Sequence, residues 1–166
     1  MDRMIRGWSG LVLIAAIAAA VPFLLSKVVR TGVPAKLAGL QIVRLYEGKE
    51  ALAIVSKMHR ESVTTENNTI GVYVGPEGSA TLYLTIYPAA GDAQLSEQRM
   101  GQRIAEGDSG FTNFQRMMVN GKQVSVCVGL GQVHCFFSHG SRLYWLASDF
   151  GVARDVLKDL MAQSVR

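Results

Sequence analysis

The chain lacks the short motifs that mark well-known classes of enzyme. Its 166 residues contain no G-x-S-x-G, H-E-x-x-H, Walker or G-x-G-x-x-G pattern. A serine hydrolase, a zinc protease, a P-loop enzyme and a dinucleotide-binding fold therefore have no motif to support them. C-x-x-C and C-x-x-C-H are also missing, so nothing marks a dithiol redox site or covalent haem. We predict no catalytic residue, no metal ligand and no cofactor.

Cysteine is scarce as well, with only Cys127 and Cys135 in the chain. They fall on consecutive predicted strands around a tight turn. A connecting loop with an odd number of residues centred on Gly131 would put them directly opposite, with Cβ atoms about 4.5–5.5 Å apart and near disulfide reach. A loop with an even number would place Cys127 opposite His134 and point the sulfurs to opposite faces. A structural disulfide, two buried free thiols and a redox pair all stay open.

A concentrated basic region is also absent from most of the chain. The formal net charge is +4, but residues 1–30 hold four basic residues and one acidic residue, which leaves 13 basic and 12 acidic residues beyond them. The excess positive charge therefore flanks the N-terminal segment and forms no stripe along the rest. We predict no nucleic-acid partner.

What the sequence does contain is a long apolar run, Gly7 to Ser26, with twenty residues and no charge. A helix of that length spans about 30 Å, the hydrocarbon thickness of a bilayer. Ala18, Ala19 and Ala20 could form the cleavage site of a signal peptide, but the run is longer than an ordinary signal core. We therefore predict that residues 1–30 are a single-pass membrane anchor whose partner is the lipid bilayer.

The side of the membrane on which the domain lies is less clearly marked. Lys27, Arg30 and Lys36 follow the run, against Arg3 and Arg6 before it, and this count slightly favours a cytoplasmic domain. A short basic tail before an apolar run is, however, how an export signal begins. We predict an extracytoplasmic domain.

The remaining residues predict one domain of the α+β class. Residues 31–39 read as a juxtamembrane linker, and residues 40–166 as a single domain with about six or seven antiparallel strands and three helices. The expected strands are 40–46, 70–74, 81–87, 114–119, 123–128, 133–138 and 143–147. The expected helices are 49–60, 92–105 and 152–163. Asn120-Gly121 is the strongest hairpin signal.

The last strands are apolar on both faces, and Phe136, Phe137, Tyr144 and Trp145 form their densest aromatic group. Three helices can cover little more than one side of such a sheet. One face is therefore expected to stay open, with Phe137 and Tyr144 as the contact for a partner protein or for self-association.

Two further hypotheses concern chemistry. His134, His59 and Asp149 are the candidates for the dispersed active site of a small exported enzyme, and Cys127 with Cys135 for a thiol redox protein. Neither has a recognised spacing. The favoured prediction is a membrane-anchored binding domain, acting as an accessory subunit of a membrane complex or as an envelope scaffold or sensor.

Overall fold

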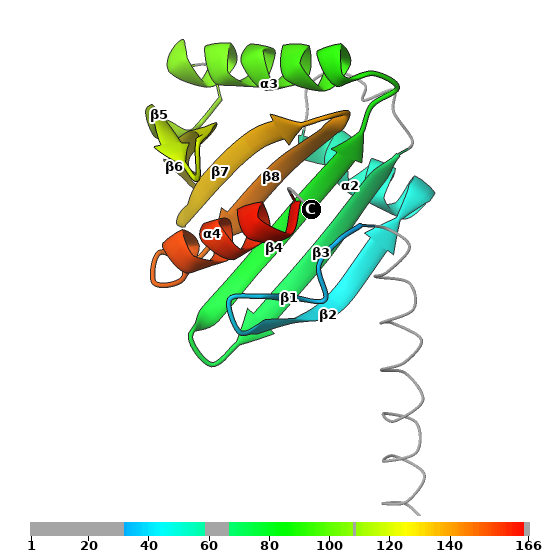
Figure 1. Cartoon of the computed structure of the whole chain (residues 1–166), viewed down its shortest axis with the longest axis vertical. Helices are drawn as coiled ribbons and strands as arrows, with labels where there is room; N and C mark the ends of the chain where they lie inside the picture. The colour runs from blue at the N-terminus through cyan, green and yellow to red at the C-terminus, as the bar shows by residue number, and fades with distance from the viewer. Residues whose placement is uncertain (1–31, 59–66, 108, 165–166) are drawn as a thin grey trace, which may run out of the picture.

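The domain is built around one sheet, as seen in the computed structural model, which describes residues 32–58, 67–107 and 109–164 (Figure 1). The elements in chain order are β1 (Lys36–Leu37), β2 (Leu40–Glu47), α2 (Gly48–Met58), β3 (Asn68–Gly75), β4 (Gly78–Ile86), α3 (Ala90–Ala105), β5 (Thr112–Val119), β6 (Lys122–Gly129), β7 (Gln132–His139), β8 (Arg142–Ser148) and α4 (Ala153–Ser164).

All eight strands are antiparallel to their neighbours, in the order β1-β2-β3-β4-β8-β7-β6-β5. The first four strands and the last four form two meanders, which meet in the middle of the sheet. There β4 pairs with β8, and Leu82 lies opposite Leu146. β8, which is the last described strand in chain order, thus lies beside β4 from the first half of the domain.

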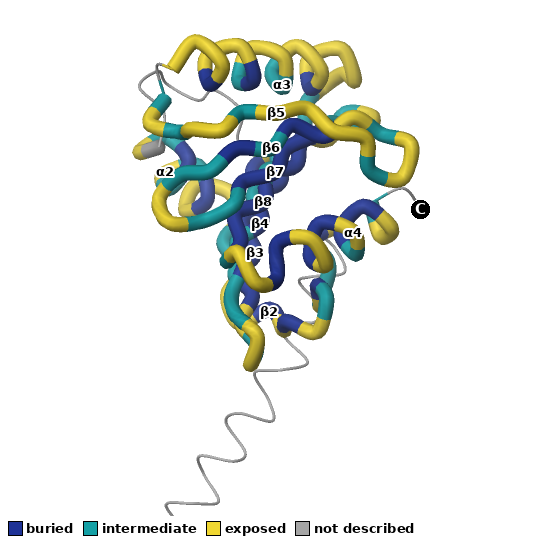
Figure 2. Tube along the Cα trace, turned by 90° about the vertical axis from the view of Figure 1, so that its left-hand side faces the viewer, coloured by how far each residue is buried: buried dark blue, intermediate teal, exposed yellow. Residues whose placement is uncertain are grey.

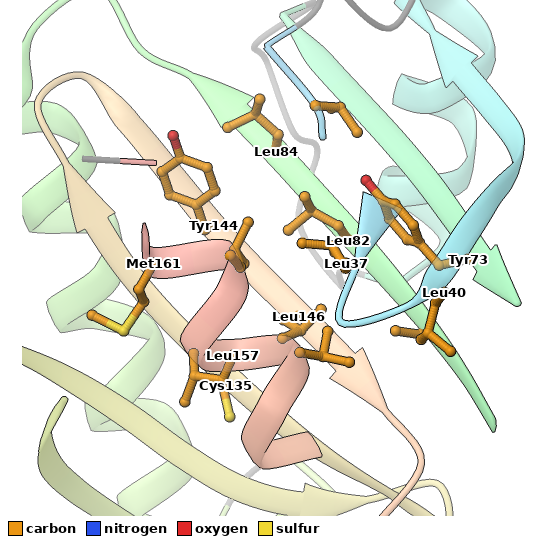
Figure 3. Close-up of a cluster of buried hydrophobic side chains, with 14 of the residues drawn as sticks. Leu37, Leu40, Tyr73, Leu82, Leu84, Cys135, Tyr144, Leu146, Leu157 and Met161 are labelled. Atoms are coloured by element: carbon orange, nitrogen blue, oxygen red, sulfur yellow. The ribbon is translucent and has the colours of Figure 1, made fainter. Parts of the chain in front are cut away.

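The two faces of the sheet are covered by different helices, and Figure 2 shows α4 on the side opposite α2. On the α4 face, Leu157 and Met161 of α4 pack in one cluster with Cys135, Tyr144 and Leu146 (Figure 3). Because side chains alternate along a strand, the residues between these point to the opposite face. That face is covered by α2, which packs on Ile70, and by α3, whose Ile104 contacts Phe136 and Cys127.

A side-chain bond also holds α3 to the sheet. Glu97 on α3 accepts hydrogen bonds from the backbone N–H and the hydroxyl of Ser138 on β7, at 2.8 and 2.6 Å. A charged acceptor strengthens such bonds. Only Ala93, Gly101 and Ile104 of this helix are buried, so the Glu97 bond supplements a small apolar contact.

The segment before β2 belongs to the core, although the sequence predicts a linker there. Val33 and Leu37 are buried, at 3% and 0% exposure. The Tyr73 hydroxyl donates to the carbonyl oxygen of Pro34 at 2.8 Å, and the backbone N–H of Ala38 donates to Asp159 on α4 at 2.7 Å. Together with α4, residues 33–40 cover one face of the sheet.

These observations correct the predicted fold class. The domain is mostly sheet, with eight antiparallel strands rather than about six or seven, together with three helices in the described part of the chain. The missed strand is β1, which is two residues long and lies in the expected linker. The transmembrane helix predicted at residues 7–26 lies outside the described residues. Among the helices that the structure does describe, none combines the length and apolar character needed to cross a membrane.

Candidate functional site

His134 is buried on β7 and both of its ring nitrogens are hydrogen-bonded. The Trp145 indole N–H donates to Nδ1 at 3.1 Å, and Nε2 lies 2.9 Å from the carbonyl oxygen of Gly129. Because Nδ1 accepts a hydrogen bond, the ring proton lies on Nε2, which donates to Gly129. Burial lowers the pKa of His134, and the bond to Gly129 partly opposes that shift. The neutral ring has no nitrogen left for a metal or a substrate.

Aromatic rings surround this imidazole on the face that α3 covers. Phe111 meets the His134 ring edge-on with centroids 4.8 Å apart, and Phe136 stacks on Trp145 at 4.9 Å. The packing is close, because a Cβ placed on Gly129 would lie 2.3 Å from the Phe111 ring. The arrangement is that of a packed aromatic core with one satisfied polar member.

Asp149, another member of the enzyme hypothesis, makes its hydrogen bonds with residues other than His134. His59 lies outside the described residues. The Asp149 carboxylate accepts from the backbone N–H and hydroxyl of Ser79, at 2.7 and 2.9 Å, and from the Gln132 amide at 3.1 Å. The bonds from Gln132 and Ser79 lower the pKa of Asp149. This carboxylate therefore joins the ends of three strands.

The two cysteines lie on opposite faces of the sheet. Val126 pairs with Cys135, while Cys127 pairs with His134. The connecting loop is Leu130-Gly131, which has an even number of residues, so the structure shows the second of the two arrangements left open by the sequence. Both thiols are free and buried.

The chemistry of these thiols follows from their burial. It raises the pKa of Cys127 to about 11 and that of Cys135 to about 12. A reactive cysteine needs access and a stabilised thiolate, and neither feature is found here. The structure thus does not bring the predicted disulfide or redox pair together.

The predicted contact surface at Phe137 and Tyr144 is also corrected. Both side chains are 1% exposed, and their rings stack on each other with centroids 4.9 Å apart. They belong to the core cluster beneath α4 and residues 33–40. The expectation of an open face was wrong here because it did not include cover from the segment before β2.

The described residues also hold no assembled set of metal ligands. Those residues include no group of three or more histidine, cysteine, aspartate or glutamate side chains that could hold an ion.

The strand β5 is one of the two edge strands and has the largest share of exposed residues in the sheet. It pairs only with β6, on one side, and most of its residues are exposed, as the yellow β5 trace in Figure 2 shows. Met117 and Met118 are 49% and 66% exposed, and alternation directs them to opposite faces. An open strand edge presents unpaired N–H and C=O groups that another strand can pair with.

The free backbone groups of β5 can be identified from its turn. Val119 and Lys122 flank the two-residue turn Asn120-Gly121, whose φ angles are +50° and +76°. These positive φ angles fit the predicted type I′ hairpin, in which the flanking residues form the closing hydrogen-bonded pair. Since hydrogen-bonded and non-bonded pairs alternate, the backbone N–H of Met118 points away from β6.

Sequence reasoning predicted this strand but not its place at the edge of the sheet. Residues 114–119 were expected to be a strand, and the consecutive Met117 and Met118 put one apolar side chain on each of its faces. The position of β5 at the edge depends on the order of the strands, which no local pattern in the sequence specifies.

Comparisons with protein-family models, with curated proteins and with solved structures found no match to this chain.

Proposed function

We propose that this chain is a binding module held at a membrane by residues 7–26. Its domain would lie on the extracytoplasmic side and act as an accessory subunit or scaffold of a membrane complex. The membrane part of the proposal rests on the twenty uncharged residues of that segment. The binding part rests on the open edge of β5.

The single observation that carries the binding function is the exposed, one-sided pairing of β5. An extended segment of a partner protein can add to such an edge through main-chain hydrogen bonds. The exposed Met117 and Met118 would supply adaptable apolar contacts on the two faces, since methionine side chains are flexible and polarisable.

Part of β5 is protected against unselective pairing. The register between β5 and β6 shifts between Thr112 and Gln115, and Arg116 places its guanidinium 5.6 Å from the centroid of the Phe114 ring. Bulges and charged side chains are common ways of guarding a sheet edge. Partner binding is therefore assigned to Gln115–Val119, where the pairing with β6 is regular.

The test uses proline to remove one outward N–H. In Met118→Pro, the partner loses a main-chain donor while the ladder between β5 and β6 keeps its bonds, because proline is tolerated on the free side of an edge strand. Met118→Leu is the matched control, since it keeps the donor and the apolar side chain. The full-length chain is extracted from membranes, and its co-purifying proteins are identified by mass spectrometry.

We expect Met118→Leu to retain the partner and Met118→Pro to lose it, with both variants showing the circular dichroism of the parent chain. A photo-crosslinking residue at Met118 should join the same partner, while one at the exposed Lys158 of α4 should not. If Met118→Pro is misfolded, the crosslinking result alone decides. Retention of the partner by folded Met118→Pro, crosslinking from Lys158 only, or a chain that crosslinks only to its own copies would overturn this proposal.

A further inference from the structure

Three basic side chains line up across neighbouring strands at one end of the α4 face. They are Lys122 on β6, His139 on β7 and Arg142 on β8, here called the basic row. His139 pairs directly with Arg142, and the Lys122 ammonium donates to Nδ1 of His139. Each strand therefore contributes one basic group to a single line.

The basic row is electrostatically uncompensated within the described residues. Lys122 and Arg142 carry like charges on either side of His139, and no described carboxylate pairs with any of the three. Burial and the charges of Lys122 and Arg142 lower the pKa of His139, and burial lowers that of Lys122. An anion bound here would relieve this repulsion.

The location of the basic row indicates which anion it meets. A Cβ placed on Gly32 would lie 3.5 Å from Nη2 of Arg142, so the chain enters the domain beside this arginine. Gly32 comes only six positions after Ser26, where the apolar run ends. Fully extended, six residues span at most about 20 Å. Lys27 and Arg30 add two further basic groups to that short connection.

We propose that the basic row binds anionic phospholipid headgroups of the membrane that holds the chain. This inference rests on the membrane attachment in the proposed function, and it is independent of partner binding at β5. Headgroup phosphates would accept hydrogen bonds from Lys122 and Arg142, and their negative charge would favour protonation of His139. The domain would then sit with this end of the sheet against the bilayer.

The opposite end of the same strands would face away from the membrane. Leu130, in the turn between β6 and β7, is 86% exposed and lies at that far end. Ser141, in the turn between β7 and β8, lies beside the basic row. These two positions give a matched pair of probes for the orientation of the domain.

The experiment places a fluorophore on the full-length chain at Ser141→Cys or, in a second chain, at Leu130→Cys. Cys127 and Cys135 are buried, so labelling without denaturant reports the added cysteine. Each chain is reconstituted into vesicles of phosphatidylcholine, with or without phosphatidylglycerol. A lipid with a spin-labelled headgroup quenches fluorophores near the membrane surface.

We expect the Ser141 label to be quenched more strongly in the anionic vesicles and the Leu130 label to be quenched equally in both. Added salt should remove the difference, because screening weakens contacts between exposed charges. Arg142→Glu and Lys122→Glu should also remove it, whereas Lys158→Glu on α4 should leave it intact.

Three other outcomes are distinguishable. Equal quenching of the Ser141 label in both kinds of vesicle, with the chain still floating with the lipid, would overturn the basic-row proposal alone. If inorganic phosphate raises the unfolding temperature through Lys122 and Arg142 while anionic lipid changes nothing, the ligand is a soluble phosphate and the lipid assignment is wrong. A chain that floats with neither vesicle would overturn the membrane attachment, and the orientation with it.

Discussion

His134 shows how a single buried polar residue is accommodated in this core. Its imidazole joins Trp145 on β8 to the carbonyl oxygen of Gly129 on β6, and aromatic rings exclude water around it. A buried polar group that keeps both partners costs little, whereas removing one partner leaves the other unsatisfied. The ring contributes to stability in its neutral form.

The neutral state of the His134 ring predicts that the domain becomes less stable as the pH is lowered. Burial lowers the pKa of folded His134, so between that value and the unfolded pKa of about 6.5 the unfolded chain binds more protons. The stabilisation is complete above the unfolded pKa and is lost as the pH falls through the folded one. Urea titrations of the parent chain should give a smaller free energy of unfolding at about pH 5 than at about pH 8.

Two variants assign this effect to His134. His134→Phe keeps a ring but leaves Trp145 and Gly129 without a partner, so it should cost about 1–3 kcal/mol at the higher pH and flatten the pH dependence. His139→Gln removes the other described histidine whose pKa is lowered. This variant should keep the part of the pH dependence that is due to His134. An equally steep dependence in His134→Phe would show that another group is responsible.

Among the secondary-structure elements, Asp149 connects strand ends that are distant in sequence. Its carboxylate binds Ser79 at the start of β4 and Gln132 at the start of β7, and its backbone N–H donates to the Ser79 carbonyl oxygen at 3.0 Å. It also precedes α4, whose path over the sheet starts from this turn. The contact holds the two meanders together at one end of their junction.

Asp149→Asn should therefore destabilise the domain without changing its fold. An amide accepts hydrogen bonds less strongly than a carboxylate, and partial exposure limits the loss to about 1 kcal/mol. Since the pKa of Asp149 is lowered, its contribution is present above the unfolded value of about 3.9 and is lost as the pH falls below it. The gap between parent and variant in denaturant midpoint should thus close in acid. A constant gap from neutral to acidic pH would contradict this role.

The elements also show what local sequence can predict. The alternation of Leu82, Leu84 and Ile86 predicted the strand at 81–87, and Asn120-Gly121 predicted the hairpin that the structure confirms. Periodicity works here because one strand face is buried and the turn needs positive φ. The length of the loop at Leu130-Gly131 decides which face of the sheet each cysteine lies on. It depends on the register between β6 and β7, which the pattern of apolar residues does not show.

In the whole molecule, cover of the sheet comes from sequence-distant segments. Residues 33–40 and α4 lie together on one face, where Asp159 binds the backbone N–H of Ala38 and the Gln163 amide donates to the carbonyl oxygen of Lys36 at 3.2 Å. Counting helices alone therefore predicted an open face that does not exist at Phe137 and Tyr144. Such long-range contacts leave no local signal in the sequence.

This arrangement predicts where the stable domain begins. A chain starting at Gly32 should fold, whereas one starting at Leu40 loses the buried Val33 and Leu37, each worth about 1.5–3 kcal/mol. It also loses the Tyr73 bond to Pro34. Thermal unfolding followed by circular dichroism should show a cooperative transition for the first chain and a much lower or absent one for the second. Equal midpoints would mean that residues 33–39 are not part of the cooperative unit.

Because β4 pairs with β8, the sheet cannot be completed until β8 has been synthesised. On the ribosome, β4 emerges well before β8, so β4 can pair with β3 but its other edge stays open until β8 has been made. Non-local pairing of this kind is slow, and the open edge of an apolar strand in a nascent chain promotes aggregation. The half-made domain is thus the species most prone to aggregation during synthesis, and α4, which follows β8, covers the centre of the sheet.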